Sequence, residues 1–230
     1  MMDAALVESI IRILFAGVII TAAYIISTRN LLSLVSVYAL QSATLVGIAL
    51  CLYTIEGAVV LLGIALVTFA SKVLIIPYFI ATIQERIRIK RDIEFHYLNP
   101  TTSLFLSMAL MLVIYMALSS IKPNVSGKPT LFFFGAVVGL SLVLMGMMVT
   151  FSRKRAITKV LGYLTMENGV LLFGMFVTEL PFIIEFLIVI DLIILVILTA
   201  ILTVGIDSTL EEYHNRLHRF YLWEGTEDVP

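Results

Sequence analysis

The fold is decided by two apolar segments, LGYLTMENGVLL (161–172) and FLIVIDLIILVIL (186–198). Each is typical of the middle of a membrane-spanning helix, and each contains one carboxylate, Glu167 in the first and Asp191 in the second. If a short turn joins the two helices, the carboxylates lie within about 3 Å of the same depth, at roughly 1.5 Å of rise per residue. A charged group at the centre of a bilayer costs at least about 2.5–3.5 kcal/mol, so two of them at one depth indicate a function.

The composition predicts a membrane protein with several spans. The 230 residues are 60% hydrophobic and 13% charged, whereas soluble domains carry about 25% charged residues. Apolar runs of about 20 residues, the length needed to cross a bilayer, recur along the chain. The sequence has no basic patch with interleaved aromatic residues, so nucleic-acid binding is not supported.

The apolar runs predict an all-α, polytopic helix bundle of about seven transmembrane helices in the lipid bilayer. We expect residues 1–207 to form the bundle and residues 208–230 to form a cytoplasmic or interfacial tail. In the tail, the i, i+4 spacing of His214 and His218 could chelate a metal, although a solvated pair is favoured because no further ligand is present. The predicted spans are 5–26, 31–54, 58–83, 102–121, 130–151, 157–178 and 182–206.

The distribution of Lys and Arg predicts the orientation of the bundle, because cytoplasmic loops are enriched in both. Arg29 and the basic clusters within 86–91 and 153–159 fall on one side of the membrane. The short connections on the other side carry neither residue, although Lys122 and Lys128 do not follow the rule. We therefore expect the N-terminus outside and the C-terminus in the cytoplasm.

A weak internal repeat relates a first three-helix unit, about 1–83, to a second one, about 130–207. The helix at 102–121 links them, and RNLLSLVSVYALQS (29–42) matches RAITKVLGYLTMEN (155–168). With one span between them, the two units point the same way. The sequence thus predicts a parallel repeat rather than the inverted kind found in many secondary transporters.

The polar residues at membrane depth correspond across this repeat. Gln41 in the second span corresponds to Glu167 in the sixth, and Lys72 in the third corresponds to Asp191 in the seventh. Glu185 lies about 9 Å outward of Asp191. These five residues are the candidate ion-translocation groups in the membrane core.

A polar stripe leads toward Glu167 from the basic cytoplasmic turn. Lys159, Tyr163 and Glu167 follow one another at i, i+4 spacing and so share one helix face. The stripe spans about 12 Å of helix. We expect Lys159 and Tyr163 to connect the buried carboxylate with the cytoplasmic surface.

Two explanations of the buried charges remain open. Burial disfavours the charged form of acids and amines alike, so an acid and a base in the membrane can exchange a proton through a short water chain. Alternatively, Lys72 pairs with Glu167 or Asp191 as a static lock that fixes helix register. Three ionisable groups and Glu185, spread over three helices, favour a relay.

Other motifs are weaker. The sequence has no Gly-rich phosphate loop, no CxxC pair and no pair of His residues within a span, so we expect no haem, iron–sulfur or nucleotide site in this chain. GAVVG (135–139) fits the GxxxG pattern, which predicts that the fifth span packs closely against a neighbour.

The motifs SKVLIIP (71–77) and ITKVLGYLTMENG (157–169), followed by Asp191, resemble component E of hydrogenase-4. This family of membrane subunits belongs to formate hydrogenlyase and related energy-converting [NiFe]-hydrogenases. The family is similar in turn to the K-type subunit of complex I and the C-type subunit of multisubunit Na⁺/H⁺ antiporters. On that resemblance Glu167 falls at the second-helix glutamate and Asp191 stands for the third-helix one. The first unit departs from the pattern, with Gln41 near the second-helix acid position and Lys72 near the third.

The resemblance implies a non-catalytic, multi-pass subunit in a prokaryotic cytoplasmic membrane. Its partners would be larger antiporter-like subunits and the membrane anchor of the redox arm, and the nickel–iron and iron–sulfur centres would belong to other chains. The subunit would contribute to proton or sodium translocation coupled to redox chemistry. A purely structural subunit of such a complex and an independent secondary transporter are the alternatives.

Overall fold

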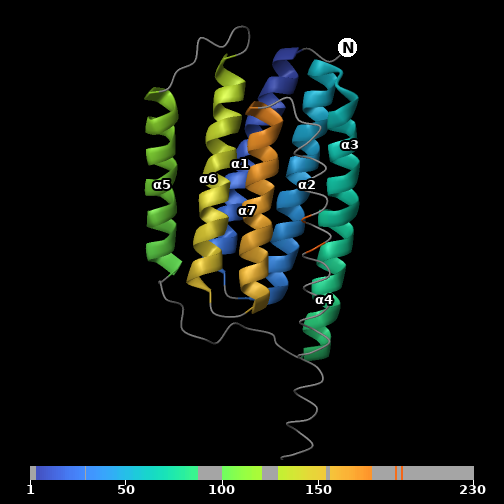
Figure 1. Cartoon of the computed structure of the whole chain (residues 1–230), viewed down its shortest axis with the longest axis vertical. Helices are drawn as coiled ribbons and strands as arrows, with labels where there is room; N and C mark the ends of the chain where they lie inside the picture. Colours follow the sequence, from blue (N-terminus) through green and yellow to red (C-terminus); the bar gives the residue numbers. More distant parts are fainter. Residues whose placement is uncertain are drawn as a thin grey trace, which may run out of the picture. The chain divides into compact units, whose positions relative to one another are not determined.

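The computed structural model describes residues 4–28, 30–87, 100–120, 129–153 and 156–177, together with Ile190 and Ile193. The described helices belong to one compact unit, Met1–Ile188. Every helix in these ranges is apolar, and they are drawn in sequence colours in Figure 1. The helical elements are α1 (Ala4–Ser27), α2 (Leu31–Glu56), α3 (Val59–Thr68), the π-helix η1 (Phe69–Ile75), α4 (Ile76–Ile87), α5 (Pro100–Ser120), α6 (Pro129–Ser152) and α7 (Ala156–Val177).

Six of the predicted spans are present in the described residues. Six helices there are long and apolar enough to cross a membrane, and α3, η1 and α4 together form the third of them. That span continues as helix to Ile87. The seventh predicted span and the tail with His214 and His218 lie outside the described residues, and the orientation in the membrane stays a prediction.

The turn between α2 and α3 follows from one glycine. Gly57 ends α2 in the left-handed conformation, with φ 67°, which residues other than glycine rarely adopt. Its N–H donates to the Tyr53 carbonyl at 2.8 Å and closes the last turn. The chain therefore reverses within three residues, and α3 packs back against α2.

Glycines bring α6 and α7 into backbone contact. A Cβ at Gly139 would lie 2.5 Å from the Phe173 backbone nitrogen, and one at Gly162 would lie 2.7 Å from the Thr150 nitrogen. Gly146 and Gly169 are equally close to the facing backbone. The close packing predicted from GAVVG is confirmed, and its partner is the helix that carries Glu167.

Arg153 holds the end of α6 against the end of α1. Its side chain is buried, and Nη2 donates to the carbonyls of Ile25 at 3.2 Å, Ile26 at 3.1 Å and Thr28 at 2.8 Å. These carbonyls belong to the last turn of α1, where no further helical N–H groups follow to bond them. A residue that the sequence marked only as part of a basic cluster is thus a helix-capping group.

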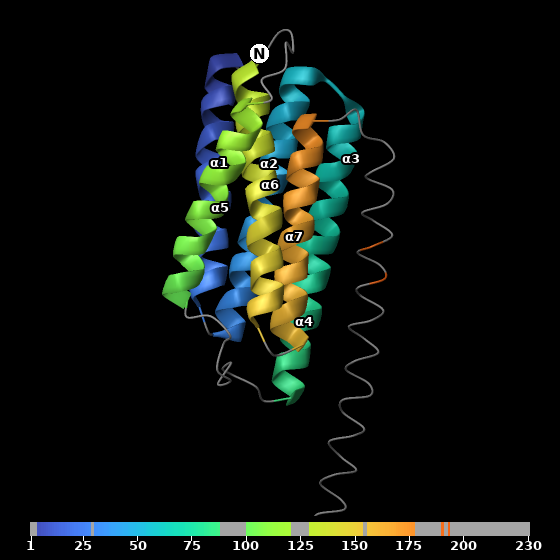
Figure 2. The same ribbon diagram turned by 60° about the vertical axis from the view of Figure 1, so that its left-hand side comes forward.

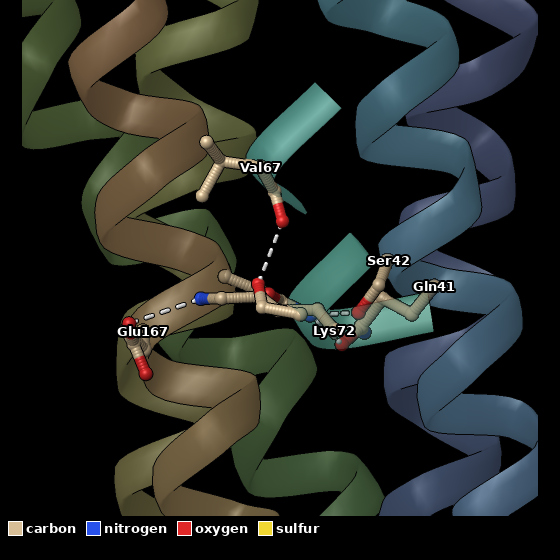
Figure 3. Close-up of polar contacts among 7 residues, drawn as sticks. Gln41, Ser42, Val67, Lys72 and Glu167 are labelled. Carbon is tan, nitrogen blue, oxygen red and sulfur yellow. Dashed lines mark hydrogen bonds and ion pairs between the residues drawn. The ribbon is translucent and has the colours of Figure 1, made fainter. Parts of the chain in front are cut away.

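Helix α2 contacts α1 on one side, the third span on another, and α7 as well. Helix α5 contacts α6 and α1 (Figure 2) and leaves most of its large apolar side chains exposed, among them Phe105 and Met108. Exposed apolar faces are the expected surface of a helix in lipid. A group of buried polar residues, described below, lies where α2, η1 and α7 meet (Figure 3).

Candidate ion-translocation site

The centre of the site is a buried ion pair between two helices. Lys72 Nζ lies 3.0 Å from Glu167 Oε1, and both side chains are 3% exposed. Figure 3 shows the lysine extending from η1 to the carboxylate on α7. The structure thus brings together two of the residues selected from the sequence and makes Glu167, within this chain, a partner of Lys72.

Lys72 lies in the middle of the π-helix. The N–H of Ile76 bonds to the carbonyl of Ser71, five residues back, instead of the usual four. The Ser71 hydroxyl donates to the Val67 carbonyl at 2.8 Å (Figure 3). Short π segments inside α-helices occur frequently at functional sites.

An amide and hydroxyl cluster lies beside the ion pair. Asn168 Nδ2 donates to Gln41 Oε1 at 3.3 Å and to Ser42 Oγ at 3.1 Å. All three side chains are fully buried. Figure 3 shows Gln41 and Ser42 on α2 at the level of Lys72.

The adjacent residues Glu167 and Asn168 serve different neighbours. Successive residues of an α-helix point about 100° apart, and here the carboxylate faces η1 while the amide faces α2. Two atoms of the cluster, Gln41 Nε2 and Asn168 Oδ1, have no hydrogen-bond partner within the described ranges. One donor and one acceptor position therefore remain beside the ion pair.

The predicted polar stripe lies on α7. Lys159 is exposed in the first turns of the helix, Tyr163 is half-buried and Glu167 is buried. Exposure thus falls step by step along the face that leads to the carboxylate. The connection of this face to the cytoplasmic surface stays a prediction.

Two residues selected from the sequence, Asp191 and Glu185, lie outside the described residues. Their place relative to the ion pair stays a prediction. The described ranges contain no group of three or more His, Cys, Asp or Glu side chains that could hold a metal.

Asn168 and Ser42 were not among the site residues predicted from the sequence, and the π-helix was not predicted either. Asn168 follows Glu167 directly in the MENG motif, so its position one step around the helix was the available signal. Pro77, within an otherwise apolar span, was the available signal for an irregular helix.

Comparison with known proteins gives no match: no family model, no curated protein and no solved structure is similar to the chain at the significance required. The resemblance to hydrogenase-4 component E therefore depends on the two sequence motifs. The structure places these motifs at one site, because SKVLIIP contributes Lys72 and ITKVLGYLTMENG contributes Glu167.

Proposed function

We propose that the chain is an antiporter-like membrane subunit in which the Lys72–Glu167 pair forms one step of proton or sodium translocation. The observation that carries the proposal is the 3.0 Å contact between two ionisable groups that are both buried in apolar helices. Ionisable groups inside membranes are rare and mark ion pathways and proton relays.

The physical case depends on burial. A low-dielectric site disfavours isolated charge, so the ionic form of the pair and its neutral form lie closer in energy than they do in water. The proton has only one short hydrogen-bond distance to travel between Nζ and Oε1. A second charge that arrives near either group would shift the equilibrium between the ionic and neutral forms of the pair, and the pair would then release or capture a proton.

A static lock is the alternative role for the same pair. The position of α7 is already fixed in two other ways. Glycines hold it against α6 at backbone distance, and Asn168 bonds it to α2. An ion pair adds little to a register that these contacts determine, and this favours the relay.

The proposed path extends from the pair in both directions. Toward the cytoplasm it follows Tyr163 and Lys159 on α7, whose exposure increases in that direction. Gln41 Nε2 and Asn168 Oδ1, which have no hydrogen-bond partner among the described residues, offer sites that a water molecule could occupy beside the pair. Asp191 and Glu185 would continue the path in the seventh span.

We further propose that the subunit belongs to an energy-converting [NiFe]-hydrogenase or formate hydrogenlyase-type complex in a prokaryotic cytoplasmic membrane. The chain would be non-catalytic, with metal centres in partner subunits, and would contact larger antiporter-like subunits and the membrane anchor of the redox arm. The motifs around Lys72 and Glu167 support this assignment. Purification of the native complex through a tag on this chain tests it. Nickel and several membrane partners are expected, and a homo-oligomer without nickel would contradict the assignment.

The relay is tested in that purified complex after reconstitution into vesicles. A potassium diffusion potential drives ions across the membrane, and an internal pH-sensitive dye reports proton movement. Glu167→Gln should leave the subunit composition unchanged and reduce flux at least tenfold. Glu8→Gln, in the first turns of α1, serves as the control and should leave flux unchanged. A Glu167→Gln complex with full flux, in the absence and presence of sodium, would contradict the relay.

A further inference from the structure

The π-helix in the third span has a cause in the sequence. Proline at position 77 has no N–H, and within a helix its ring collides with the carbonyl four residues earlier, here that of Val73. The π segment, Phe69–Ile75, ends two residues before this proline. Ile76 keeps helical angles, with φ −62° and ψ −49°, so the helix is widened and not broken.

The widening has a consequence for the direction of Lys72. The buried positions Thr68, Lys72, Ile76 and Ile80 are four residues apart. In a regular α-helix each such step overshoots a full turn by about 40°, so three steps would rotate the last position by about 120°. A π turn accommodates one extra residue, worth about 100° of rotation, and cancels most of this drift.

The π turn therefore keeps one face of the span in line. Buried residues follow the span from α3 through the lysine in η1 to α4. Helix α2 packs along this whole face. Ser71 also favours the irregular helix. Its hydroxyl bonds to the Val67 carbonyl four residues back, and such bonds favour local bending of a helix.

We infer that Pro77 is a positioning residue: it maintains the π turn that aims Lys72 at Glu167. Its role in ion movement rests on the proposed function, but its role in geometry does not. The inference therefore has a structural readout and a functional readout that can fail separately.

The structural readout is the distance between the Lys72 ammonium nitrogen and the Glu167 carboxyl carbon. Solid-state NMR measures it in bilayers with ¹⁵N-lysine and ¹³C-glutamate labels. Pro77→Ala restores an N–H for the Val73 carbonyl and permits a regular α-helix. The dipolar coupling between the Lys72 nitrogen and the Glu167 carboxyl carbon, which reports their distance, should therefore weaken or disappear. Pro129→Ala is the matched control, because Pro129 begins α6 and interrupts no helical bond. An unchanged distance in Pro77→Ala would overturn the inference.

A second pair of variants tests the extra residue itself. In the Pro77→Ala background, deletion of the exposed Leu74 removes one residue from the widened turn and restores the alignment of the two buried faces. This chain should fold with a yield close to that of Pro77→Ala. Deletion of Leu50, which is exposed on the regular helix α2, should rotate the rest of that helix by about 100° and abolish folding. Equal loss of folded protein in both deletions would overturn the inference.

The flux assay separates the inference from the proposed function. If Pro77→Ala lengthens the Lys72–Glu167 distance and flux falls, both stand. If the distance lengthens and flux is unchanged, Pro77 positions the lysine but the relay is wrong.

Discussion

Asn168 of α7 donates its side-chain amide to the hydroxyl of Ser42 on α2 at 3.1 Å. In the alignment of residues 29–42 with 155–168 these two residues occupy the same position. Contact between equivalent positions is what a pseudo-two-fold axis between α2 and α7 would produce. The ion pair lies directly beside this contact, because Glu167 precedes Asn168.

Replacement of Asn168 by Leu should destabilise the bundle. The change removes the hydrogen bonds to Gln41 and Ser42 and leaves both side chains buried and less satisfied. Each unsatisfied buried group costs about 1–3 kcal/mol, so for the two groups we expect a loss of about 2–6 kcal/mol in the free energy of unfolding. Denaturant unfolding in micelles measures it. Ser36→Ala, which removes an exposed intrahelical bond, is the control, and equal stability of the two variants would argue against a structural role for the cluster.

Arg153→Ala should loosen the end of α1. The substitution leaves the carbonyls of Ile25, Ile26 and Thr28 without the guanidinium that binds them. Hydrogen bonds to charged groups contribute about 1.5–3 kcal/mol, and we expect a loss in that range. Thermal unfolding in micelles gives the value, with the exposed Lys159→Ala as the matched loss of a positive charge. If both variants unfold at the same temperature, Arg153 acts only through its charge.

Two glycine-to-alanine substitutions should change stability in opposite directions. At Gly139 the new methyl group would lie 2.5 Å from the Phe173 backbone nitrogen and force α6 and α7 apart. Overpacking of this kind costs about 1–3 kcal/mol. At Gly63 in α3 the methyl group meets nothing within 4 Å, so the better helix propensity of Ala should stabilise by about 1 kcal/mol. The free energies of unfolding of both variants, measured under the same conditions, test these predictions. A Gly139→Ala variant as stable as the wild type would mean that α6 and α7 are not packed at backbone distance.

The positions of the helices could be predicted from the sequence, because an apolar run of sufficient length has few alternatives in a membrane. The second span was expected at 31–54 and is observed at Leu31–Glu56, and the sixth was expected at 157–178 and is observed at Ala156–Val177.

The rotation of the helices could not be predicted in the same way. Most faces of these spans are apolar, so periodicity does not tell which face is buried. For this reason the sequence left open whether Lys72 meets Glu167 or Asp191. The structure shows a contact between Lys72 and Glu167, and Asp191 lies outside the described residues. The π turn also rotates the residues that follow it around the helix axis, and a prediction that assumes 3.6 residues per turn does not include this rotation.

The central claim is that the Lys72–Glu167 pair moves protons and does not merely hold helices together. The double variant Lys72→Gln/Glu167→Gln tests it most directly, because it removes both charges of the pair and leaves neither partner as an unpaired ion. The quantity to measure is proton flux in vesicles that contain the purified complex, after its subunit composition has been verified. The relay predicts an assembled complex whose flux is reduced at least tenfold. An assembled complex with wild-type flux would contradict the relay.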